Sequence, residues 1–366
     1  MKNALSREKF KQKCRQTEIG DYIELIYGDG LPERDREGGK YPVYGSNGIV
    51  GYHDRALVKG PGIIIGRKGT VGQITLSKGD FWPIDTTYYV KLKEDGDIFF
   101  WFYLLQTLGL SQMNSHSAVP GLNRDNVYSI LKKIPLLKEQ RAIAKILSDL
   151  DEKIELNHQI NKTLESIAKA IFKRWFVDFE FPGYEKNKFV GGLPKGWRHG
   201  ALGEIISIES GKRPSEKSET KTEDFTVPLI GASSVMGFVK DALYNEPILI
   251  IGRVGTHGVV QRVSWPSFPS DNTLVIRSEY FEFVYQILKV IDCEALNVGT
   301  TQPLITQTAI NRYSIVIPSD EILKQFETAV SGLFEKVIAN NQESESLVEI
   351  RDSLLPRLMS GKRRVL

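Results

Sequence analysis

The strongest constraint on the fold of this chain is an internal repeat. Five segments of the first half recur in the second half at an offset of 183 to 186 residues. The matched segments are 19–30 with 202–214, 41–57 with 226–243, 63–73 with 249–260, 83–92 with 269–278, and 119–135 with 302–318. An offset this constant indicates a duplication, so we expect two similar halves. The length of 366 residues agrees with two or three domains of about 150 residues each.

Each half changes from a strand-like, glycine-rich segment to a helical one after an Ile-Pro pair. From there, residues recur at steps of three and four, which predicts a heptad seam of about four heptads on each helix. We expect the helices to start near Lys138 and Glu321, the first to end at the Phe-Pro-Gly of 181–183, and Pro356 to kink or end the second. The seam residues are Leu147, Leu150, Ile154, Asn157, Leu164 and Ile171 on the first helix, and Val330, Leu333, Val337, Asn340, Leu347 and Leu354 on the second.

These patterns predict an α+β fold with four parts. A first strand-rich globular domain covers residues 1–136 and a first spacer helix covers 137–181; a second globular domain covers 182–320 and a second spacer helix covers 321–366. About 45 helical residues would give a rod of roughly 65 Å. To bury its seam, the second helix must return along the first, so we expect a long antiparallel coiled coil with an approximate two-fold repeat.

Asn157 and Asn340 occupy the same place in the two predicted seams. A polar seam residue costs stability but fixes register when it pairs across the helices. The alternative is a helix end that is open to water. Because both helices carry the asparagine, we favour pairing.

Glycines recur at every third position in both halves, as Gly66, Gly69 and Gly72 and as their counterparts 252, 255 and 258. This spacing differs from the G-x-G-x-x-G of dinucleotide folds. Hairpin or bulge geometry that needs positive φ is the favoured explanation, and a cradle for a phosphate is the alternative; the two are compatible. An arginine follows the first glycine in each half and could bind phosphate or guanine, or form a structural salt bridge.

A search for catalytic and metal-binding motifs finds none. The sequence has no Walker motif, no H-E-x-x-H, no G-x-S-x-G and no Pro-Pro of an amino-methyltransferase motif. Two nuclease-like pairs, Glu219 with Lys221 and Asp151 with Lys153, are better explained as solvated charges. The two cysteines and five histidines show no metal-ligand spacing, which argues against a zinc protein.

The composition is that of a globular protein, with 41% hydrophobic and 25% charged residues. No apolar run approaches the roughly 20 residues that span a bilayer, and the N-terminal residues lack the apolar core of a signal peptide. We therefore expect a soluble, cytoplasmic protein. The net charge of +3 is not concentrated in a polybasic arm, so any DNA contact must come from a patterned surface.

Three segments together carry a family resemblance: KYPVYGSNGIVGYHD at 40–54, GIIIGRKGTVG at 62–72, and LLKEQRAIAKILSDLDEKIELN at 136–157. With the duplicated head–helix arrangement, they resemble the specificity subunit of type I restriction–modification systems. The resemblance covers nearly the whole chain. In the second half IGASSVMGFVKD stands where the first half has YGSNGIVGYHD, so the two heads should read different sequences.

The resemblance implies a chain without catalysis of its own. Two target-recognition domains would read the halves of a split, asymmetric site in double-stranded DNA, and the helices would set the gap and dock two methyltransferase subunits. Those subunits would use S-adenosylmethionine to methylate adenine N6, and two restriction subunits would supply an ATP- and Mg²⁺-dependent motor and nuclease. This chain would bind no cofactor and no metal itself.

The candidate DNA-contacting residues lie in the glycine-rich segments, in polar-aromatic segments predicted as loops, and before the last strand-like segment of each half. In the first half they are Tyr44, Ser46, Asn47, Arg67, Lys68, Thr70, Asn123 and Arg124, and in the second Ser233, Ser234, Arg253, Thr256, His257, Thr301 and Gln302. Two other classes of function stay open on the residues alone: a self-contained nuclease or methyltransferase, and a scaffold whose heads grip proteins.

Overall fold

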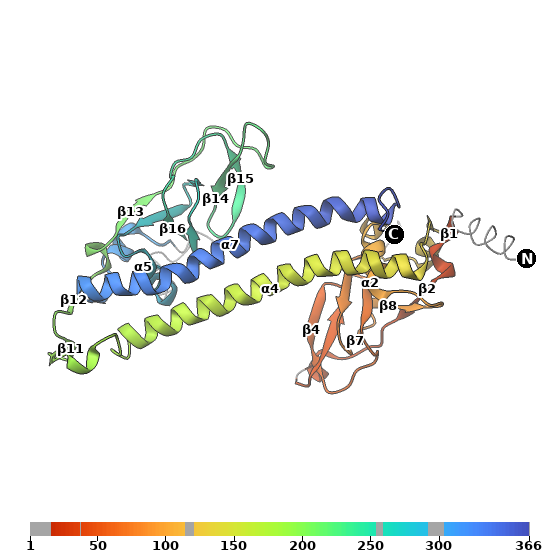
Figure 1. Ribbon diagram of the computed structural model, residues 1–366, viewed down its shortest axis with the longest axis horizontal. Helices are drawn as coiled ribbons and strands as arrows, with labels where there is room; N and C mark the ends of the chain where they lie inside the picture. Colours follow the sequence, from red (N-terminus) through yellow and green to blue (C-terminus); the bar gives the residue numbers. More distant parts are fainter. Residues whose placement is uncertain (1–15, 37, 114–120, 254–258, 292–303, 366) are drawn as a thin grey trace, which may run out of the picture. The chain divides into compact units, whose positions relative to one another are not determined.

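The computed structural model describes residues 16–36, 38–113, 121–253, 259–291 and 304–365. It divides into two compact units, one formed by residues 1–158 with 341–366 and the other by 159–340. Each unit contains one strand-rich head and half of each of two long helices, α4 (Leu137–Phe176) and α7 (Asp320–Met359) (Figure 1).

The head of the first unit is built on a four-stranded antiparallel sheet and a three-stranded sheet. The large sheet has the order β2-β8-β5-β6 and the small one β4-β3-β7, in which β3 and β7 are parallel. The strands are β1 (Thr17–Glu18), β2 (Ile23–Tyr27), β3 (Tyr41–Gly45), β4 (Gly48–His53), β5 (Gly62–Gly66), β6 (Ile74–Ser77), β7 (Trp82–Pro83), β8 (Thr87–Leu92) and β9 (Leu131–Lys132). The helices are α2 (Ile98–Gln106) and α3 (Arg124–Tyr128), with 3-10 turns at Ile19–Asp21, Glu33–Asp35 and Leu110–Gln112.

Helix α2 has the almost wholly apolar sequence IFFWFYLLQ, and it buries Phe100, Trp101 and Leu104 in the same core as Ile63 and Ile65 of the large sheet. A helix that is apolar on every side is expected in a core rather than on a surface. This packing fixes the large sheet of the first unit.

The head of the second unit repeats this plan. Its sheets have the orders β13-β19-β16-β17 and β15-β14-β18, which match the first head strand for strand. The strands are β10 (Phe189–Val190), β11 (Leu193–Pro194), β12 (Arg198–Ala201), β13 (Ser207–Ser210), β14 (Val227–Ile230), β15 (Val235–Val239), β16 (Ile248–Gly252), β17 (Val260–Val263), β18 (Phe268–Pro269), β19 (Thr273–Arg277) and β20 (Ser314–Ile317). The helices are α5 (Phe281–Val290) and α6 (Gln307–Asn311), with 3-10 turns at Tyr184–Lys186 and Leu202–Glu204. The duplication predicted from the sequence is confirmed.

The polar-aromatic segment predicted as a loop is instead a β-hairpin. Strands β3 and β4 are joined by Ser46 and Asn47, and the pairing shifts by one residue next to Tyr44. Tyr44 lies in β3, is 6% exposed and packs on Phe81, so the prediction that it contacts DNA is wrong. The equivalent pair β14 and β15 has the same register shift. Gly51 and Gly237, 186 residues apart, both have positive φ, at 153° and 145°.

The long helices start within one residue of the predicted positions, and α7 ends within one turn of Pro356, but α4 does not end where expected. Helix α4 stops at Phe176, and the chain turns through Phe179, whose φ is 60°, before Phe181 stacks on Trp197 at 5.2 Å. Helix α7 runs through Pro356 to Met359. All twelve predicted seam residues are buried or half-buried.

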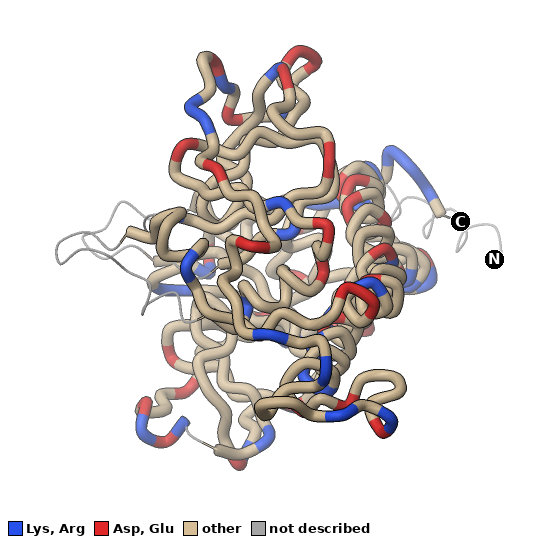
Figure 2. Tube along the Cα trace, turned by 90° about the vertical axis from the view of Figure 1, so that its left-hand side faces the viewer, with Lys and Arg blue, Asp and Glu red and all other residues tan. Residues whose placement is uncertain are grey.

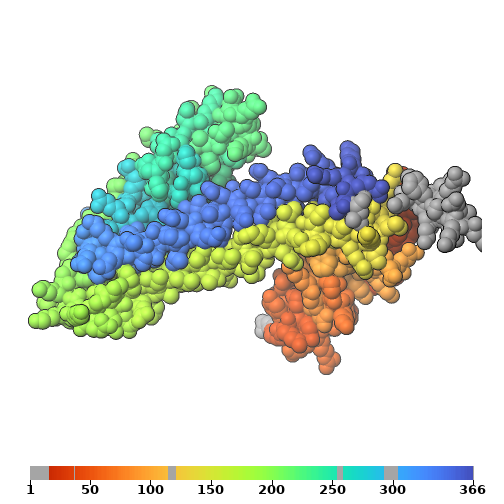
Figure 3. Space-filling view, viewed as in Figure 1, coloured from red at the N-terminus to blue at the C-terminus, as the bar shows by residue number. Residues whose placement is uncertain are grey.

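In each unit the two helices run antiparallel. In the first unit Asp151 pairs with Arg351 at 2.8 Å, and Asn157, further along α4, bonds to Glu343, which comes earlier on α7. In the second unit Asn161 meets Asn340. The space-filling view shows the two helical surfaces in direct contact (Figure 3).

Both seam asparagines are buried, with 0% of Asn157 and 1% of Asn340 exposed. Asn157 donates to Ser344 Oγ at 3.2 Å, and Asn340 donates to Asn161 Oδ1 at 2.8 Å. The offset of 183 relates these two bonds to each other, because it converts 157 to 340 and 161 to 344. The expected pairing across the seam is confirmed, and the exposed alternative is excluded.

Candidate nucleic-acid interface

Three residues from distant parts of the first head meet on one exposed aromatic ring. Tyr27 ends β2, Arg67 follows β5 and Arg124 begins α3. The guanidinium carbon of Arg67 lies 5.0 Å from the centre of the Tyr27 ring, and that of Arg124 lies 4.7 Å away. Tyr27 is 48% exposed. Two cations on an exposed tyrosine form a surface suited to phosphates and base edges.

Arg67 is held by the two residues that precede β8, Asp85 and Thr86. Its N–H donates to Thr86 O at 2.9 Å, and its Nε and Nη2 donate to Asp85 O at 3.2 and 2.7 Å. The Arg67 side chain is therefore held by a backbone carbonyl group, whereas the alternative was a structural salt bridge. Because a guanidinium carries five N–H donors, this anchor orients Arg67 without using up its capacity to bind a ligand.

Glycine allows the tight turn that follows Arg67. Gly69 and Gly72 both have φ of 75°, and Gly72 donates from its N–H to Gly66 O at 2.8 Å. A Cβ at Gly66 would lie 2.1 Å from Thr70 O, so this position needs glycine for close approach. The positive-φ explanation of the glycine spacing is confirmed for residues 69 and 72, while 255 and 258 lie outside the described residues.

Arg124 is placed by a bond between the two loops and by a helix cap. Leu122 donates from its N–H to Arg67 O at 3.0 Å, and Asn123 Oδ1 accepts from the N–H of Asp125 at 2.8 Å. The side chain of Asn123, a candidate DNA contact, thus caps α3. Arg124 Nη1 lies 3.4 Å from Leu25 O.

A neutral phenol lies beneath the two cations. Tyr88 packs 5.0 Å from Tyr27 between ring centres and donates to Leu122 O at 3.1 Å. Burial, followed by its hydrogen bond with Tyr27, raises the pKa of Tyr88 to about 12, although Arg67 and Arg124 act in the opposite direction. Tyr88 therefore stays a neutral phenol at neutral pH and adds no negative charge beside the two arginines.

Ser46 joins this site through the hairpin turn. Its Oγ donates to Thr86 O at 2.9 Å, the same carbonyl that accepts from the N–H groups of Arg67 and Lys68. Asn47, which follows Ser46, and Lys68 and Thr70, which follow Arg67, are exposed. Of the eight candidates in the first half, the structure brings Ser46, Arg67, Lys68 and Arg124 into one surface region.

The second head carries a different set of side chains at the equivalent place. Arg253 Nη1 lies 3.4 Å from Ser210 Oγ, and Gln307 Nε2 donates to the same oxygen at 3.0 Å. Within the described part of the chain, Nε of Arg253 is buried and has no hydrogen-bond partner. Ser233 and Ser234 are exposed in the turn between β14 and β15.

Four candidates of the second half, Thr256, His257, Thr301 and Gln302, lie outside the described residues. The sequence analysis did not identify Tyr27, Ser210 or Gln307. The repeat contained a usable signal, because each of Tyr27 and Ser210 directly precedes a glycine at the offset of 183. The backbone bonds from Gly28 to Thr87 O and from Gly211 to Thr273 O confirm that these positions correspond.

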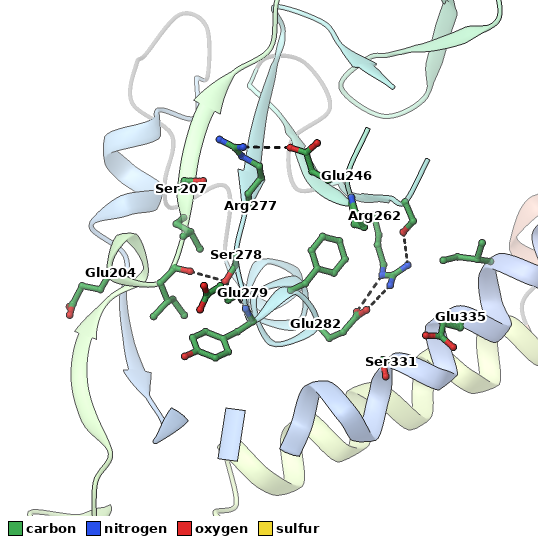
Figure 4. A pocket seen from close by; sticks show the side chains of 17 residues that line it. Glu204, Ser207, Glu246, Arg262, Arg277, Ser278, Glu279, Glu282, Ser331 and Glu335 are labelled. Atoms are coloured by element: carbon green, nitrogen blue, oxygen red, sulfur yellow. Dashed lines mark hydrogen bonds and ion pairs between the residues drawn. The ribbon is translucent and has the colours of Figure 1, made fainter. Parts of the chain in front are cut away.

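A hollow of about 1100 Å³ in the second unit lies beside α7 (Figure 4). Several of its charged groups pair with each other: Arg262 contacts Glu282 at 2.5 Å, and Arg277 contacts Glu246 at 3.5 Å. Paired charges in an open hollow give no arrangement of nucleophile and base. The cluster of Arg67 and Arg124 on Tyr27, rather than this hollow, is the candidate site.

Acidic and basic residues are interspersed along the trace (Figure 2). Among the described residues, no group of three or more His, Cys, Asp or Glu could hold a metal ion. A search of the same residues finds no helix that is long and apolar enough to cross a membrane.

Comparison with known proteins places these features in a family. The family model described as "Type I restriction modification DNA specificity domain" matches twice, at residues 13–166 and 194–348. The MjaIX specificity subunit of Methanocaldococcus jannaschii is 28% identical over 343 residues, covering 83% of this chain and 78% of that protein. The HindI specificity subunit of Haemophilus influenzae is 27% identical, covering 66% and 71%. A crystal structure of a type I system S subunit from M. genitalium has a TM-score of 0.68 at 19% identity and covers 94% of this chain and 96% of that one.

A duplicated fold of strand-rich heads and long helices, in which the family model matches once in each half, defines a class of DNA specificity proteins. The chain belongs to the type I restriction–modification DNA specificity family. The predicted fold class, family and role as a specificity subunit rather than an enzyme are confirmed by these matches.

Proposed function

We propose that the chain reads a split and asymmetric site in double-stranded DNA, one half with each head. The observation that carries this proposal is the cluster of Arg67 and Arg124 on Tyr27, at a place that the second head fills with Arg253 and Gln307. Equivalent surfaces with different side chains favour two different half-sites.

In this proposal α4 and α7 set the gap between the half-sites and dock two methyltransferase subunits. The support is the duplication itself: a pseudo-two-fold chain offers two equivalent surfaces to two copies of one partner. The methyltransferase subunits would bind S-adenosylmethionine, and two restriction subunits would bind ATP and Mg²⁺. The complex would act in the cytoplasm, where the chromosome is.

The first test is base-resolution mapping of N6-methyladenine in cells that express this chain with the methyltransferase subunit from its gene neighbourhood. We expect one bipartite motif with a fixed gap that disappears when this chain is omitted. Methylation that does not depend on this chain would refute the proposal.

A second test measures duplex binding by the purified complex over a range of salt concentrations. The double variant Arg67→Ala with Arg124→Ala should lose about tenfold or more in affinity and show a shallower salt dependence, because each phosphate contact adds about 0.9 to the slope. Lys145→Ala is the control, since Lys145 is exposed on α4 and paired with Asp149 at 2.8 Å. Binding without any salt dependence would favour the protein-gripping scaffold.

A further inference from the structure

Arg124 and Gln307 occupy the same backbone position in the two heads. Each is the first residue of a short helix, α3 or α6, and follows a capping side chain: Asn123 Oδ1 accepts from Asp125 N–H, and Thr306 Oγ1 accepts from Ala309 N–H at 3.1 Å. The helices are therefore entered in the same way.

The hydrogen bonds between loops are also the same in the two heads. Leu122 donates to Arg67 O at 3.0 Å, and its equivalent Ile305 donates to Arg253 O at 3.1 Å. The two arginines are themselves held alike, by N–H bonds to Thr86 O and to Asn272 O, both at 2.9 Å. The framework is thus the same in both heads.

The side chains on this framework differ as matched pairs. Arg124 stacks on Tyr27 in the first head, whereas Gln307 donates to Ser210 in the second. Tyr27 and Ser210 are equivalent strand ends, since they pair with Tyr88 and with Leu274 at the same register. A constant framework with coordinated changes at two contacting positions is the pattern expected of residues that set specificity.

The chemistry of each pair suggests a base. Arginine donates bidentately to O6 and N7 of guanine, and glutamine pairs with N6 and N7 of adenine. Arg67 and Arg253 are the same residue in both heads, so they cannot distinguish the half-sites and suit contacts with phosphate. Resting on the function proposed above, we propose that Arg124 selects a guanine in one half-site and that Gln307 selects an adenine in the other.

The test is methylation mapping with the variants Arg124→Gln and Gln307→Arg in the complete complex. Arg124→Gln should change one position of one half-site from guanine towards adenine by about tenfold or more, and leave the other half-site and the gap unchanged. Gln307→Arg should make the reverse change in the other half-site. Asn126→Ala, an exposed change on α3, is the control and should keep the wild-type motif.

A double variant keeps the test valid if Arg124→Gln alone does not fold. Tyr27→Ser combined with Arg124→Gln transfers the complete pair of the second head, including the serine that accepts from Gln307. It should show the same change of base as Arg124→Gln alone.

The outcomes separate the inference from the proposed function. A wild-type motif that persists in both single variants and in the double variant would overturn the inference while leaving the function intact. A loss of affinity for all duplexes alike would assign Arg124 to phosphate and also overturn it. Failure of the wild-type complex to produce any motif that depends on this chain would refute the proposed function itself.

Discussion

Glu327 shows how a single residue ties a head to a long helix. Its carboxylate, on α7, accepts from the N–H groups of Glu282 and Phe283 at 3.0 and 2.9 Å. These N–H groups lie at the start of α5, which has no cap from its own Tyr280 side chain. A carboxylate at a helix N-terminus satisfies free donors and the helix dipole.

The first unit makes the equivalent junction with different groups. There Asp97 caps α2 by accepting from Phe100 N–H at 2.9 Å, and Gln140 of α4 accepts from Asp97 N–H at 3.0 Å. Gln140 therefore bonds to the N–H of the capping residue itself, whereas Glu327 bonds to two N–H groups inside the first turn of α5. In the second junction the half-buried carboxylate of Glu327 accepts from the N–H of Phe283, as Asp97 accepts from the N–H of Phe100 in the first.

Titration of Glu327 should make the stability of the second unit depend on pH. Burial raises the pKa of Glu327 from 4.5 to about 7, with nearby Glu282 acting in the same direction and Arg262 and the two N–H bonds opposing it. Between these two pH values the folded state binds more protons than the unfolded state, so the free energy of unfolding falls as pH rises from about 4.5 to about 7. Wild-type protein should lose on the order of 1–3 kcal/mol of unfolding free energy across this pH range through Glu327, and Glu327→Gln should remove this loss. Calorimetric unfolding at several pH values measures it.

Glu335→Gln is the control for this prediction, because Glu335 is exposed further along the same helix. Burial also raises the pKa of Glu282, so part of the slope should remain in Glu327→Gln. An unchanged slope in the Glu327 variant would show that the carboxylate stays ionised.

The pair of long helices is the element that the sequence predicts best. Heptad spacing is a local property, and it locates both helix starts within one residue. The end of α4 depends instead on tertiary packing, because Phe181 leaves the helical path to stack on Trp197. The spacing of residues in the sequence does not predict the contact of Phe181 with Trp197.

The sequence predicts a loop in place of the hairpin β3–β4 for a different reason. The register shift between Val43 and Tyr44 makes three successive residues of β3 buried, which hides the alternation that marks a strand. Tyr44 then faces the core although it belongs to a polar-aromatic stretch. Similarly, Arg67 and Arg124 could be predicted as cations in suitable segments, but their meeting on Tyr27 depends on strand register.

The buried polar residues between α4 and α7 give a prediction about the stability of the helix pair. Asn340→Ala removes the donor of a buried bond to Asn161, which should destabilise the protein by about 1–3 kcal/mol in urea unfolding. The exposed Gln342→Ala, on the same helix, should change stability by less than about 0.5 kcal/mol. Equal effects of the two substitutions would mean that the buried amide adds nothing.

Across the whole molecule, duplication has kept the backbone framework and changed the side chains at the proposed contact positions. Arg67 and Arg253 keep the same backbone bonds, while Tyr27 has become Ser210 and Arg124 has become Gln307, or the reverse. An exact duplication would read a symmetric site. Divergence at such positions allows an asymmetric site on one fold.

The helices offer a way to change the gap without changing the half-sites. Each is a single helix of 40 residues that begins in one unit and ends in the other. The bonded pairs Asn157–Ser344 and Asn161–Asn340 show which levels face each other, so residues 158–164 and 337–343 form matched heptads. Deleting both preserves the apolar face, because seven residues are close to two turns.

This double deletion removes about 10 Å of rise, equal to about three base pairs of duplex. Under the proposed function, methylation mapping should therefore find the same two half-sites with a gap about three base pairs shorter. Deleting 158–164 alone is the matched control; it breaks the pairing of the asparagine layer and should abolish methylation. Altered half-sites with an unchanged gap in the double deletion would mean that the helices do not measure the distance between the sites.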